Sequence, residues 1–306
     1  PEPGRGEILV RTLYSGISTG TELLAYRGDV DPQVPLDETI GSLGGTFSYP
    51  FRYGYGCVGV VERSGHSIPS GTLVFAFHPH QDRFVCTGRD AVVVPGVDPR
   101  LATMFPLVET GVQIALDAGL VFGETVLVMG LGAVGLLTSL LLKRSGAGVV
   151  ATDPSRVRRD VAGELGVETV APDDLHERLG GGVALVVEVS GNPDALVAAL
   201  GLLDHEGTAL VASWYGRKPV TLPLGGDFHR RRLTIRGTQV STIPARLARR
   251  WTIEGRRRLV TQLLGELPLK DLATHEFAFD RAADAFAALD RGDDSLLHAA
   301  LVYERD

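Results

Sequence analysis

The sequence predicts an α/β protein, with a doubly wound parallel sheet in one domain and a β-rich second domain. The chain has 306 residues, a length that suits two domains better than one core. Short β-branched runs, punctuated by glycine and proline, fill the first third of the chain. From Leu107 onward, strand-like runs alternate with helix-length segments, which is typical of a parallel sheet with helices on both faces.

The first third is expected to hold short strands, and a final strand is expected to return to it. The β-rich runs are 7–11, 58–62, 72–77 and 91–94, and the last strand is 299–303. The alternating region predicts strands at 125–129, 148–152, 184–189, 208–213 and 233–237, with helices at 133–145, 156–165 and 194–203. Two more helical stretches follow, at 246–264 and 280–289. The predicted domains are residues 1–106 with 241–306, and residues 107–240.

Composition excludes several classes of protein. Apolar residues make up 44% and charged residues 22%, which is a globular profile. The formal charge of -7 gives no general attraction to nucleic acid or to an anionic membrane. Glycines interrupt the apolar stretch 126–142, so we expect no membrane helix there. With two cysteines, Cys57 and Cys86, and no secretory signal, we expect a cytoplasmic protein that acts on a small molecule.

The sharpest local signal is a glycine-rich turn that directly follows the apolar strand 126–129. It reads Gly130-Leu131-Gly132-Ala133-Val134-Gly135. Gly130 permits a tight turn, Gly132 lets the backbone approach a pyrophosphate, and Gly135 lets helix and strand pack closely. The free N–H groups of Ala133, Val134 and their neighbours at the start of the helix then face the phosphates. The turn therefore predicts a Rossmann-type dinucleotide site.

An acidic residue ends the next strand. Asp153 stands 18 residues after Gly135, where a carboxylate can accept both ribose hydroxyls of a dinucleotide. Its charge repels the 2′-phosphate of NADP, so NAD is favoured as the cofactor over NADP. Arg156, Arg158 and Arg159 follow closely and can moderate that repulsion. The alternative is a solvated loop aspartate after an ordinary βαβ turn.

Two N-terminal segments resemble the medium-chain dehydrogenase/reductase superfamily, which combines a GroES-like domain with a Rossmann domain. The segment 14–22 resembles the one that carries the first zinc-ligand cysteine, and Ser18 stands at that position. The segment 53–61 resembles the Gly-His-Glu segment, and Tyr55 stands where the zinc-binding histidine would be. Pro106 or its neighbours match the third ligand. Serine, tyrosine and proline do not form a zinc site, so the resemblance implies a zinc-independent member.

The chain is also similar to the branch that includes bacteriochlorophyllide a dehydrogenase. The matching segments are 16–22, 53–62, 77–81, 109–110, 213–216, 222–225 and 228–236. This resemblance implies an oxidoreductase of a secondary alcohol and ketone, and it does not carry over the substrate. The superfamily also implies a homodimer through the edge strand 233–237 and a strand before Pro1, so the N-terminus is expected to be trimmed.

Without zinc, another group must polarise the carbonyl oxygen and move its proton. The hydroxyl of Tyr55 is one candidate, and the alternative is an aromatic ring that fills the vacated space. Glu109 would be buried near the cofactor, which suits a carboxyl to proton transfer, and the alternative is a helix N-terminal acid. His80 is a candidate general acid from a loop that also carries His78; a His-x-His metal pair lacks a third ligand.

Further residues are expected around the cofactor or on the surface. Thr110 lies where the superfamily's helix meets the nicotinamide, and Trp214 follows a strand end where members place residues over it. Trp214 can stack on the cofactor or pack between domains. His229 is expected to be a surface histidine. The arginines of 246–251 and 256–258 are expected to form an exposed helix face, with anionic substrate groups as the alternative.

Three functions follow from these patterns. The first is an NAD(H)-dependent oxidoreductase that interconverts a secondary alcohol and a ketone on a biosynthetic intermediate. The second is an NADPH-dependent C=C or quinone reductase, against which Asp153 argues. The third is a non-catalytic dinucleotide-binding redox sensor, which the candidate groups Tyr55 and Glu109 disfavour.

Overall fold

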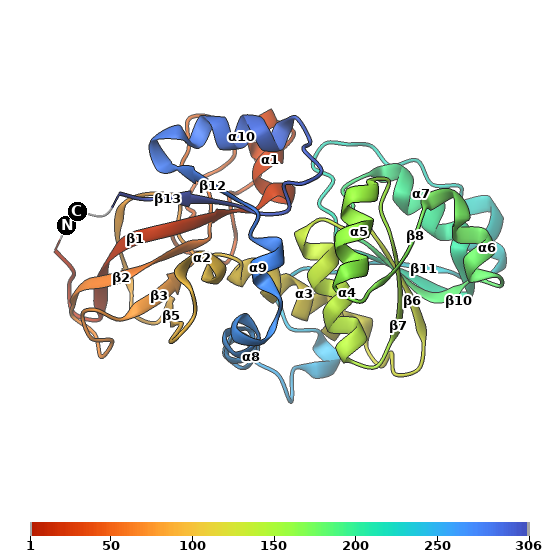
Figure 1. The fold of residues 1–306 in the computed structure, drawn as a ribbon, viewed down its shortest axis with the longest axis horizontal. Helices are drawn as coiled ribbons and strands as arrows, with labels where there is room; N and C mark the ends of the chain where they lie inside the picture. Colours follow the sequence, from red (N-terminus) through yellow and green to blue (C-terminus); the bar gives the residue numbers. More distant parts are fainter. Residues whose placement is uncertain (1, 305–306) are drawn as a thin grey trace. The chain divides into compact units, whose positions relative to one another are not determined.

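The computed structural model describes residues 2–304, which divide into two compact units (Figure 1). One unit holds the residues up to Pro106 together with those from Arg257 onward, and the other holds Leu107–Arg256. Each unit has its own sheet.

The first unit is built on a seven-stranded sheet of order β12-β13-β1-β2-β3-β5, with β4 also paired to β1. Its strands are β1 (Glu7–Ile17), β2 (Cys57–Ser64), β3 (Leu73–Ala76), β4 (Arg83–Thr87), β5 (Ala91–Val93), β12 (His275–Ala278) and β13 (Ala299–Val302). The last strand does return to this sheet as predicted, because β13 runs antiparallel to β1 with Tyr14 opposite Val302. The long β1 runs through the centre of the unit (Figure 1).

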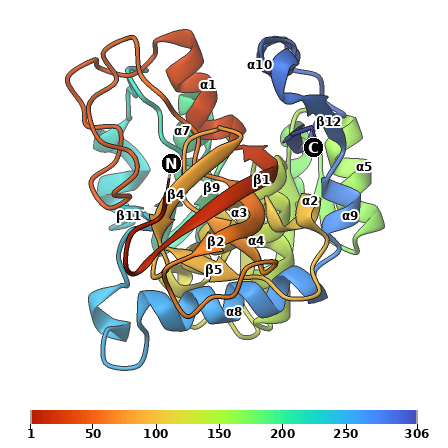
Figure 2. The ribbon, with the colours of Figure 1, turned by 90° about the vertical axis from the view of Figure 1, so that its left-hand side faces the viewer.

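Helices and a long irregular segment accompany this sheet. The helices are α1 (Thr19–Arg27), α2 (Pro99–Ala102), α9 (Leu269–Leu272) and α10 (Ala282–Asp290), with a 3₁₀ turn, η4, at Phe279–Arg281. The segment between α1 and β2 forms loops beside α1 (Figure 2) and buries its own apolar cluster around Leu36, Leu43 and Phe47. A second cluster, with Ile8, Val10 and Phe84, lies on the sheet itself. The loop cluster matters for function because Tyr53 and Tyr55 pack against it.

The second unit is a six-stranded parallel sheet of order β11-β10-β9-β6-β7-β8. Its strands are β6 (Thr125–Met129), β7 (Gly148–Thr152), β8 (Glu168–Val170), β9 (Val183–Glu188), β10 (Leu203–Val211) and β11 (Thr234–Gly237). Its helices are α4 (Ala133–Arg144), α5 (Arg156–Glu164), α6 (Leu175–Leu179) and α7 (Pro193–Leu202), with short turns η1 (Pro172–Asp174), η2 (Leu224–Phe228) and η3 (Ala245–Leu247). Two helices cross the boundary of the units, α3 (Phe105–Ala118) and α8 (Ile253–Glu266). The predicted doubly wound sheet is confirmed.

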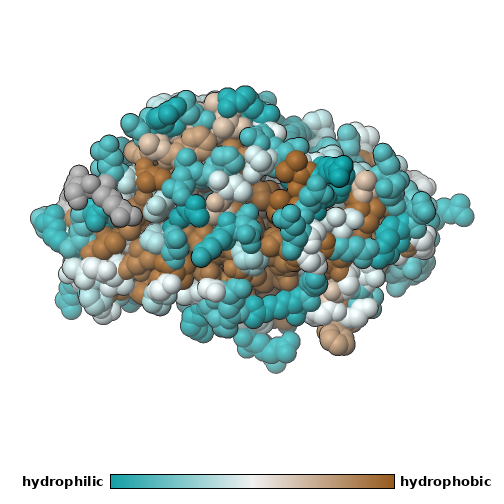
Figure 3. Space-filling view, in the orientation of Figure 1, coloured by the Kyte–Doolittle hydropathy of each residue, from teal (hydrophilic) through white to brown (hydrophobic). Residues whose placement is uncertain are grey.

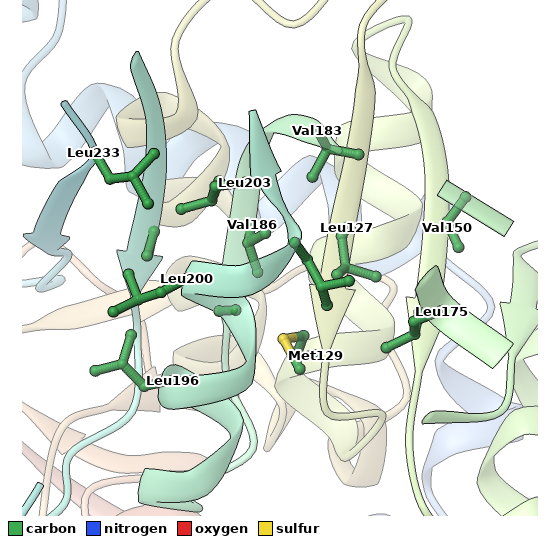
Figure 4. Close-up of a cluster of buried hydrophobic side chains, with 13 residues drawn as sticks. Leu127, Met129, Val150, Leu175, Val183, Val186, Leu196, Leu200, Leu203 and Leu233 are labelled. Atoms are coloured by element: carbon green, nitrogen blue, oxygen red, sulfur yellow. The ribbon is translucent and has the colours of Figure 1, made fainter. Parts of the chain in front are cut away.

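Leucine and valine side chains hold α7 on this sheet. Leu196 and Leu200 of α7 pack in one cluster with Leu127 of β6 and Val186 of β9 (Figure 4). Burial of such a side chain contributes roughly 1.5–3 kcal/mol to stability. The cluster fixes the carboxyl ends of β6 and β9, which is the edge where the glycine turn begins.

Three differences from the sequence analysis have physical reasons. Residues 241–256 belong to the second unit rather than the first, because Arg256 is buried against Glu109 and Gln113 of α3. The predicted helix 246–264 is broken, since the Thr252 hydroxyl accepts the Gly255 N–H at 3.0 Å and starts a new helix. Strand β4 was missed, as were α1 and the full length of α3.

The surface mixes polar side chains with apolar patches on the face that Figure 3 shows. Among residues 2–304, every helix is too short or too polar to cross a membrane.

Candidate active site

The glycine-rich turn joins β6 to α4 in the geometry that the sequence predicts. Gly130 has a φ of 106°, a left-handed conformation that favours glycine, and a Cβ there would lie 2.7 Å from the Cα of Ser190. A Cβ at Gly135 would collide with the carbonyl oxygen of Gly130. At Gly132, in contrast, a Cβ would meet nothing within 4 Å. Two glycines are therefore needed for packing, while the third leaves open space beside the helix N-terminus.

Asp153 lies directly after β7 and is joined to this turn. Its Oδ2 accepts the Leu131 N–H at 2.8 Å, and its Oδ1 accepts the Ser155 N–H at 2.9 Å. Arg158 lies 4.0 Å from Oδ2, and Arg159 donates to the backbone oxygen of Asp153 at 2.6 Å. The buried carboxylate thus holds the turn in place, and each of its oxygens retains a lone pair for a ligand.

The loop after β9 lies next to the glycine-rich turn, with Ser190 beside Gly130. Glu188 is buried at the end of β9, and its Oε1 accepts hydrogen bonds from the Ser190 N–H (2.7 Å) and hydroxyl (2.6 Å). Its Oε2 accepts the Tyr215 hydroxyl at 2.5 Å, and both burial and this carboxylate raise the pKa of Tyr215. Ser213 binds the Gly191 N–H at 2.8 Å. Glu188 therefore ties the ends of β9 and β10 together beside Gly130.

The two remaining residues expected at the cofactor also belong to the second unit. Trp214 follows β10 beside Tyr215, and 42% of its surface is exposed. Thr110 is on α3 next to Gly111, where a Cβ would lie 3.0 Å from Leu141 of α4. The partly exposed indole follows the carboxyl end of β10, and its stacking on a cofactor stays a prediction, whereas the position of Thr110 is set by the close packing of α3 on α4.

These features fit a dinucleotide. The turn leaves open space at Gly132, it precedes the twelve-residue helix α4, and an acid lies at the end of the next strand. The backbone N–H groups at the start of α4 can hold a pyrophosphate, and Asp153 can hold ribose hydroxyls.

In the first unit, Tyr55 lies among other hydroxyl groups. The hydroxyl groups of Ser18 and Thr21 lie near its phenol and lower its pKa. Ser18 precedes α1 as its N-cap residue, yet its hydroxyl makes no capping bond to the helix. Burial and the nearby Glu22 carboxylate raise the pKa of Tyr55 to about 12. The tyrosine therefore stays protonated near neutral pH and can donate a hydrogen bond.

His80 lies behind this group, with both ring nitrogens engaged. Its Nε2 is 2.8 Å from Oε2 of Glu22, and its Nδ1 is 2.7 Å from the Ser15 hydroxyl. The Ser15 hydroxyl is in turn 2.9 Å from the Tyr303 hydroxyl. The sequence analysis did not foresee that this histidine would have partners on both sides; its role as a general acid stays a prediction. His78 stacks on Phe84 instead, and burial lowers its pKa.

Glu109 is 2% exposed and forms a buried ion pair with Arg256 in the second unit. Arg256 Nε and Nη2 lie 3.2 and 3.0 Å from Oε1 of Glu109, Nη1 donates to Gln113, and Nη2 donates to the Val240 carbonyl at 2.6 Å. Arg256 was expected on an exposed helix face, and this was wrong because its guanidinium completes the α3 network. The catalytic role of Glu109 stays a prediction.

Known families match the second unit and, more weakly, the whole chain. The family model described as zinc-binding dehydrogenase matches residues 133–252. L-threonine 3-dehydrogenase from Pyrococcus horikoshii is 27% identical, with 95% of this chain and 90% of that protein covered. L-galactonate-5-dehydrogenase from Escherichia coli is 28% identical over 62% of this chain, and the match spans 55% of that protein.

Solved dehydrogenase structures share the fold. Galactitol-1-phosphate dehydrogenase from Escherichia coli has a TM-score of 0.79 at 17% identity, with 99% of this chain and 94% of that chain covered. A zinc-binding dehydrogenase from Sinorhizobium meliloti, bound to NADP, has a TM-score of 0.77 at 21% identity, with 99% and 93% covered. Residues 133–252 are therefore similar to the zinc-binding dehydrogenase family, and the whole chain has the fold of these dehydrogenases. Two of the solved neighbours hold a nicotinamide cofactor, NADP in one and NADH in the other.

The donor atoms of this chain do not fit the zinc that the description of the matching family names. Among residues 2–304, no group of three or more His, Cys, Asp and Glu side chains could hold a metal ion. In the first unit, the imidazole of His80 and the carboxylate of Glu22 bind each other, and His80 also binds the Ser15 hydroxyl. Hydroxyl groups such as those of Ser18 and Tyr55 are not the thiolate, imidazole and carboxylate ligands that zinc takes.

Sequence reasoning missed two polar residues of the candidate site. Glu22 and Glu188 were not singled out, although each is a carboxylate in or next to a segment that was discussed. Glu22 had a detectable signal, because Thr19-Gly20-Thr21-Glu22 has the S/T-x-x-E spacing of a capping box. In the structure its Oε1 accepts the N–H of Ser18, one residue earlier, at 2.7 Å. Glu188 ends a buried strand, which is where ligand-binding residues of parallel sheets lie.

Proposed function

We propose that this dehydrogenase uses NAD(H) to interconvert a secondary alcohol and a ketone on a biosynthetic intermediate, without a catalytic zinc. The observation that carries the proposal is the junction of Asp153 with the glycine turn, where an acid and open backbone lie together. The alcohol and polyol dehydrogenases among its relatives support the reaction class.

The charge of Asp153 favours NAD over NADP. The carboxylate accepts two backbone N–H groups and keeps lone pairs for ribose hydroxyls, whereas a 2′-phosphate would meet a negative charge. Arg158, 4.0 Å away, reduces that repulsion. This arginine, together with the NADP-bound structural neighbour, is what favours the second candidate, an NADPH-dependent C=C or quinone reductase.

When bound, the nicotinamide supplies the hydride acceptor or donor. We propose that the reacting oxygen atom of the substrate binds at the hydroxyl groups of Tyr55, Ser18 and Thr21. In ketone reduction one of these hydroxyls would donate its proton to the ketone oxygen, and solvent would return that proton; in alcohol oxidation the hydroxyl accepts a hydrogen bond from the alcohol O–H, whose proton is released to solvent. A tyrosine whose pKa is about 12 remains a hydrogen-bond donor at neutral pH, which is the polarising role that a metal would otherwise fill.

We further propose that the chain belongs to the branch that includes bacteriochlorophyllide a dehydrogenase, as a cytoplasmic homodimer joined along the edge strand β11. The segments 53–62 and 77–81, which carry that resemblance, also supply Tyr55 and His80. A homodimer would double the molecular mass measured by light scattering during gel filtration.

The cofactor assignment is tested by calorimetric titration of metal-free protein with NADH and then NADPH. We expect tight NADH binding in the wild type. Asp153→Asn keeps an acceptor for the Leu131 N–H and removes the charge, so it should weaken NADH binding and strengthen NADPH binding. A wild-type preference for NADPH would promote the reductase alternative. Binding of neither dinucleotide would remove the enzyme hypothesis.

The chemical assignment is tested by assay of secondary alcohols with NAD in the presence of a strong chelator. Tyr55→Phe should lower kcat by about 10²–10⁴-fold, the usual contribution of a positioned acid, while NADH affinity stays unchanged. Loss of wild-type turnover on chelation would contradict the zinc-free mechanism. Nucleotide binding without turnover of any alcohol, ketone, enone or quinone would favour the redox sensor.

A further inference from the structure

A buried carboxylate and a histidine connect the segments that carry the hydroxyls of Tyr55, Ser18 and Thr21. Glu22 is 2% exposed and uses both carboxylate oxygens: Oε1 accepts the Ser18 N–H at 2.7 Å, and Oε2 lies 2.8 Å from His80. One side chain therefore joins the start of α1 to the loop that carries His80.

The imidazole then reaches the segment that carries Tyr55. Gly54 has a φ of 97°, and a Cβ there would collide with the His80 ring. The backbone N–H of His80 also donates to the backbone carbonyl of Tyr53 at 3.1 Å. The absence of a side chain at Gly54 thus lets the imidazole lie against the backbone next to Tyr55. The far side of His80 is held by the buried Ser15 and, through it, by Tyr303.

Charge also links Glu22 to the tyrosine. Four groups affect the pKa of the Tyr55 phenol: Glu22 on α1, Asp37 in the loop after it, and the hydroxyls of Ser18 and Thr21. The ring of Tyr53 also packs edge-on against that of Tyr55, with centroids 6.1 Å apart. Burial and the two carboxylates raise the pKa of Tyr55, with Glu22 the stronger of the two, and the hydroxyls lower it. Glu22 therefore acts on both the position of Ser18 and the proton of Tyr55.

We propose that Glu22 and His80 are positioning residues that together hold the hydroxyls of Tyr55, Ser18 and Thr21 in register with the reacting oxygen of the substrate. In this role His80 does not donate to the substrate, because its two nitrogens face Glu22 and Ser15. The inference rests on the proposed function, which makes Tyr55 the group that touches the substrate.

The first experiment observes Tyr55 without cofactor or substrate. Protein labelled at the tyrosine Cζ is titrated by NMR up to the highest pH at which circular dichroism shows it folded, and Tyr55→Phe identifies the resonance. Glu22→Gln keeps the side-chain shape and removes the charge, so the Tyr55 titration should begin at lower pH. Glu62→Gln, which makes the same change at a half-buried carboxylate of the same unit, should leave it unchanged.

The second experiment measures turnover and nucleotide binding in the same variants. Glu22→Gln and His80→Gln should lower kcat by about 10²-fold, the size expected when reacting groups are misplaced, with NADH affinity unchanged. Glu22→Asp, which restores the charge on a shorter side chain, should recover the Tyr55 titration and part of kcat.

The two hypotheses fail in different ways. A wild type that binds no NADH contradicts the proposed function, whatever the tyrosine does. A Tyr55 titration that is the same in Glu22→Gln as in wild type overturns the role of Glu22 even if turnover falls. The Tyr55 resonances of the wild type and of Glu22→Asp serve as references for the folded state. The titration of each variant is compared with them only over the pH range in which that variant is folded.

Discussion

Two buried carboxylates, Glu22 in the first unit and Glu109 in the second, differ mainly in the partner that each has. Both are 2% exposed. Glu109 faces a guanidinium, which carries its charge at any accessible pH, at 3.0 Å. Glu22 faces an imidazole at 2.8 Å, which carries a charge only when it is protonated.

The partner decides what each carboxylate can do. A proton added to Glu109 would leave Arg256 as an uncompensated buried cation, which is costly. The Glu22–His80 contact needs no permanent cation, because the N–H of a neutral imidazole also donates to a carboxylate. We therefore interpret the Glu109–Arg256 pair as a structural clamp between α3 and α8, and the Glu22–His80 pair as part of the site that acts on the substrate.

The largest expected effect comes from breaking the clamp. Arg256→Met should lower the free energy of unfolding by about 3–5 kcal/mol, because it leaves Glu109 buried without its partner. His80→Gln should cost only about 1 kcal/mol, since the glutamine amide can still donate a hydrogen bond to Glu22. Urea unfolding of both variants measures the difference.

A double variant provides the control for this prediction. Arg256→Met combined with Glu109→Leu removes both charges and should recover most of the lost stability. Equal losses in Arg256→Met and His80→Gln would contradict the distinction between the two pairs. Full stability in Glu109→Gln together with a large loss of kcat would restore Glu109 as the catalytic acid.

The elements that the sequence predicts best are those with local signals. Strands β6 and β7 match their predicted bounds because each is a short buried apolar run that ends at glycine or at Asp153. Helix α1 was missed because Gly20 and threonines weaken its helical pattern, and its start depends on Glu22 rather than on a Ser18 side-chain cap.

The residues of the candidate site also differ in how far apart they lie in the sequence. The glycine turn and Asp153 lie within 24 residues of each other, so their relation follows from one βαβ unit. Glu22 and His80 are separated by 58 residues, and Glu109 and Arg256 by 147. Such pairs are formed by tertiary packing, and no local pattern in a single sequence specifies them. This is why Tyr55 and His80 were candidates and Glu22, which connects their segments, was not.

A second prediction concerns His298, a buried histidine of the first unit whose partner is a hydroxyl group rather than a carboxylate. His298 is buried with Thr103 at 3.0 Å, and burial, assisted by Arg100, lowers its pKa from 6.5 to about 4. The unfolded chain therefore takes up a proton that the folded chain refuses. This contribution is intact above pH 6.5 and is lost as the pH falls toward about 4, by up to about 3 kcal/mol.

Unfolding measured across that pH range checks this contribution. His298→Gln should flatten the loss of stability between pH 6.5 and about 4 relative to wild type. Parallel curves for the two proteins would mean that His298 is not the group responsible. The result can be set beside the Glu22–His80 pair, because it shows how a buried imidazole affects stability when its partner is a hydroxyl group rather than a carboxylate.

The smallest expected effect lies at the far end of the His80 chain of hydrogen bonds. Tyr303→Phe removes the 2.9 Å bond to Ser15 and keeps the ring stacked on Phe279, whose centroid is 4.4 Å away. We expect a loss of about 0.5–1.5 kcal/mol by urea unfolding, the usual net value of one hydrogen bond, with NADH affinity unchanged. Ser15 keeps its bond to His80 in this variant, so the orientation of the imidazole should persist. A loss as large as that of Arg256→Met would instead make Tyr303, Ser15, His80 and Glu22 one cooperative unit, as tightly coupled as the clamp of the second unit.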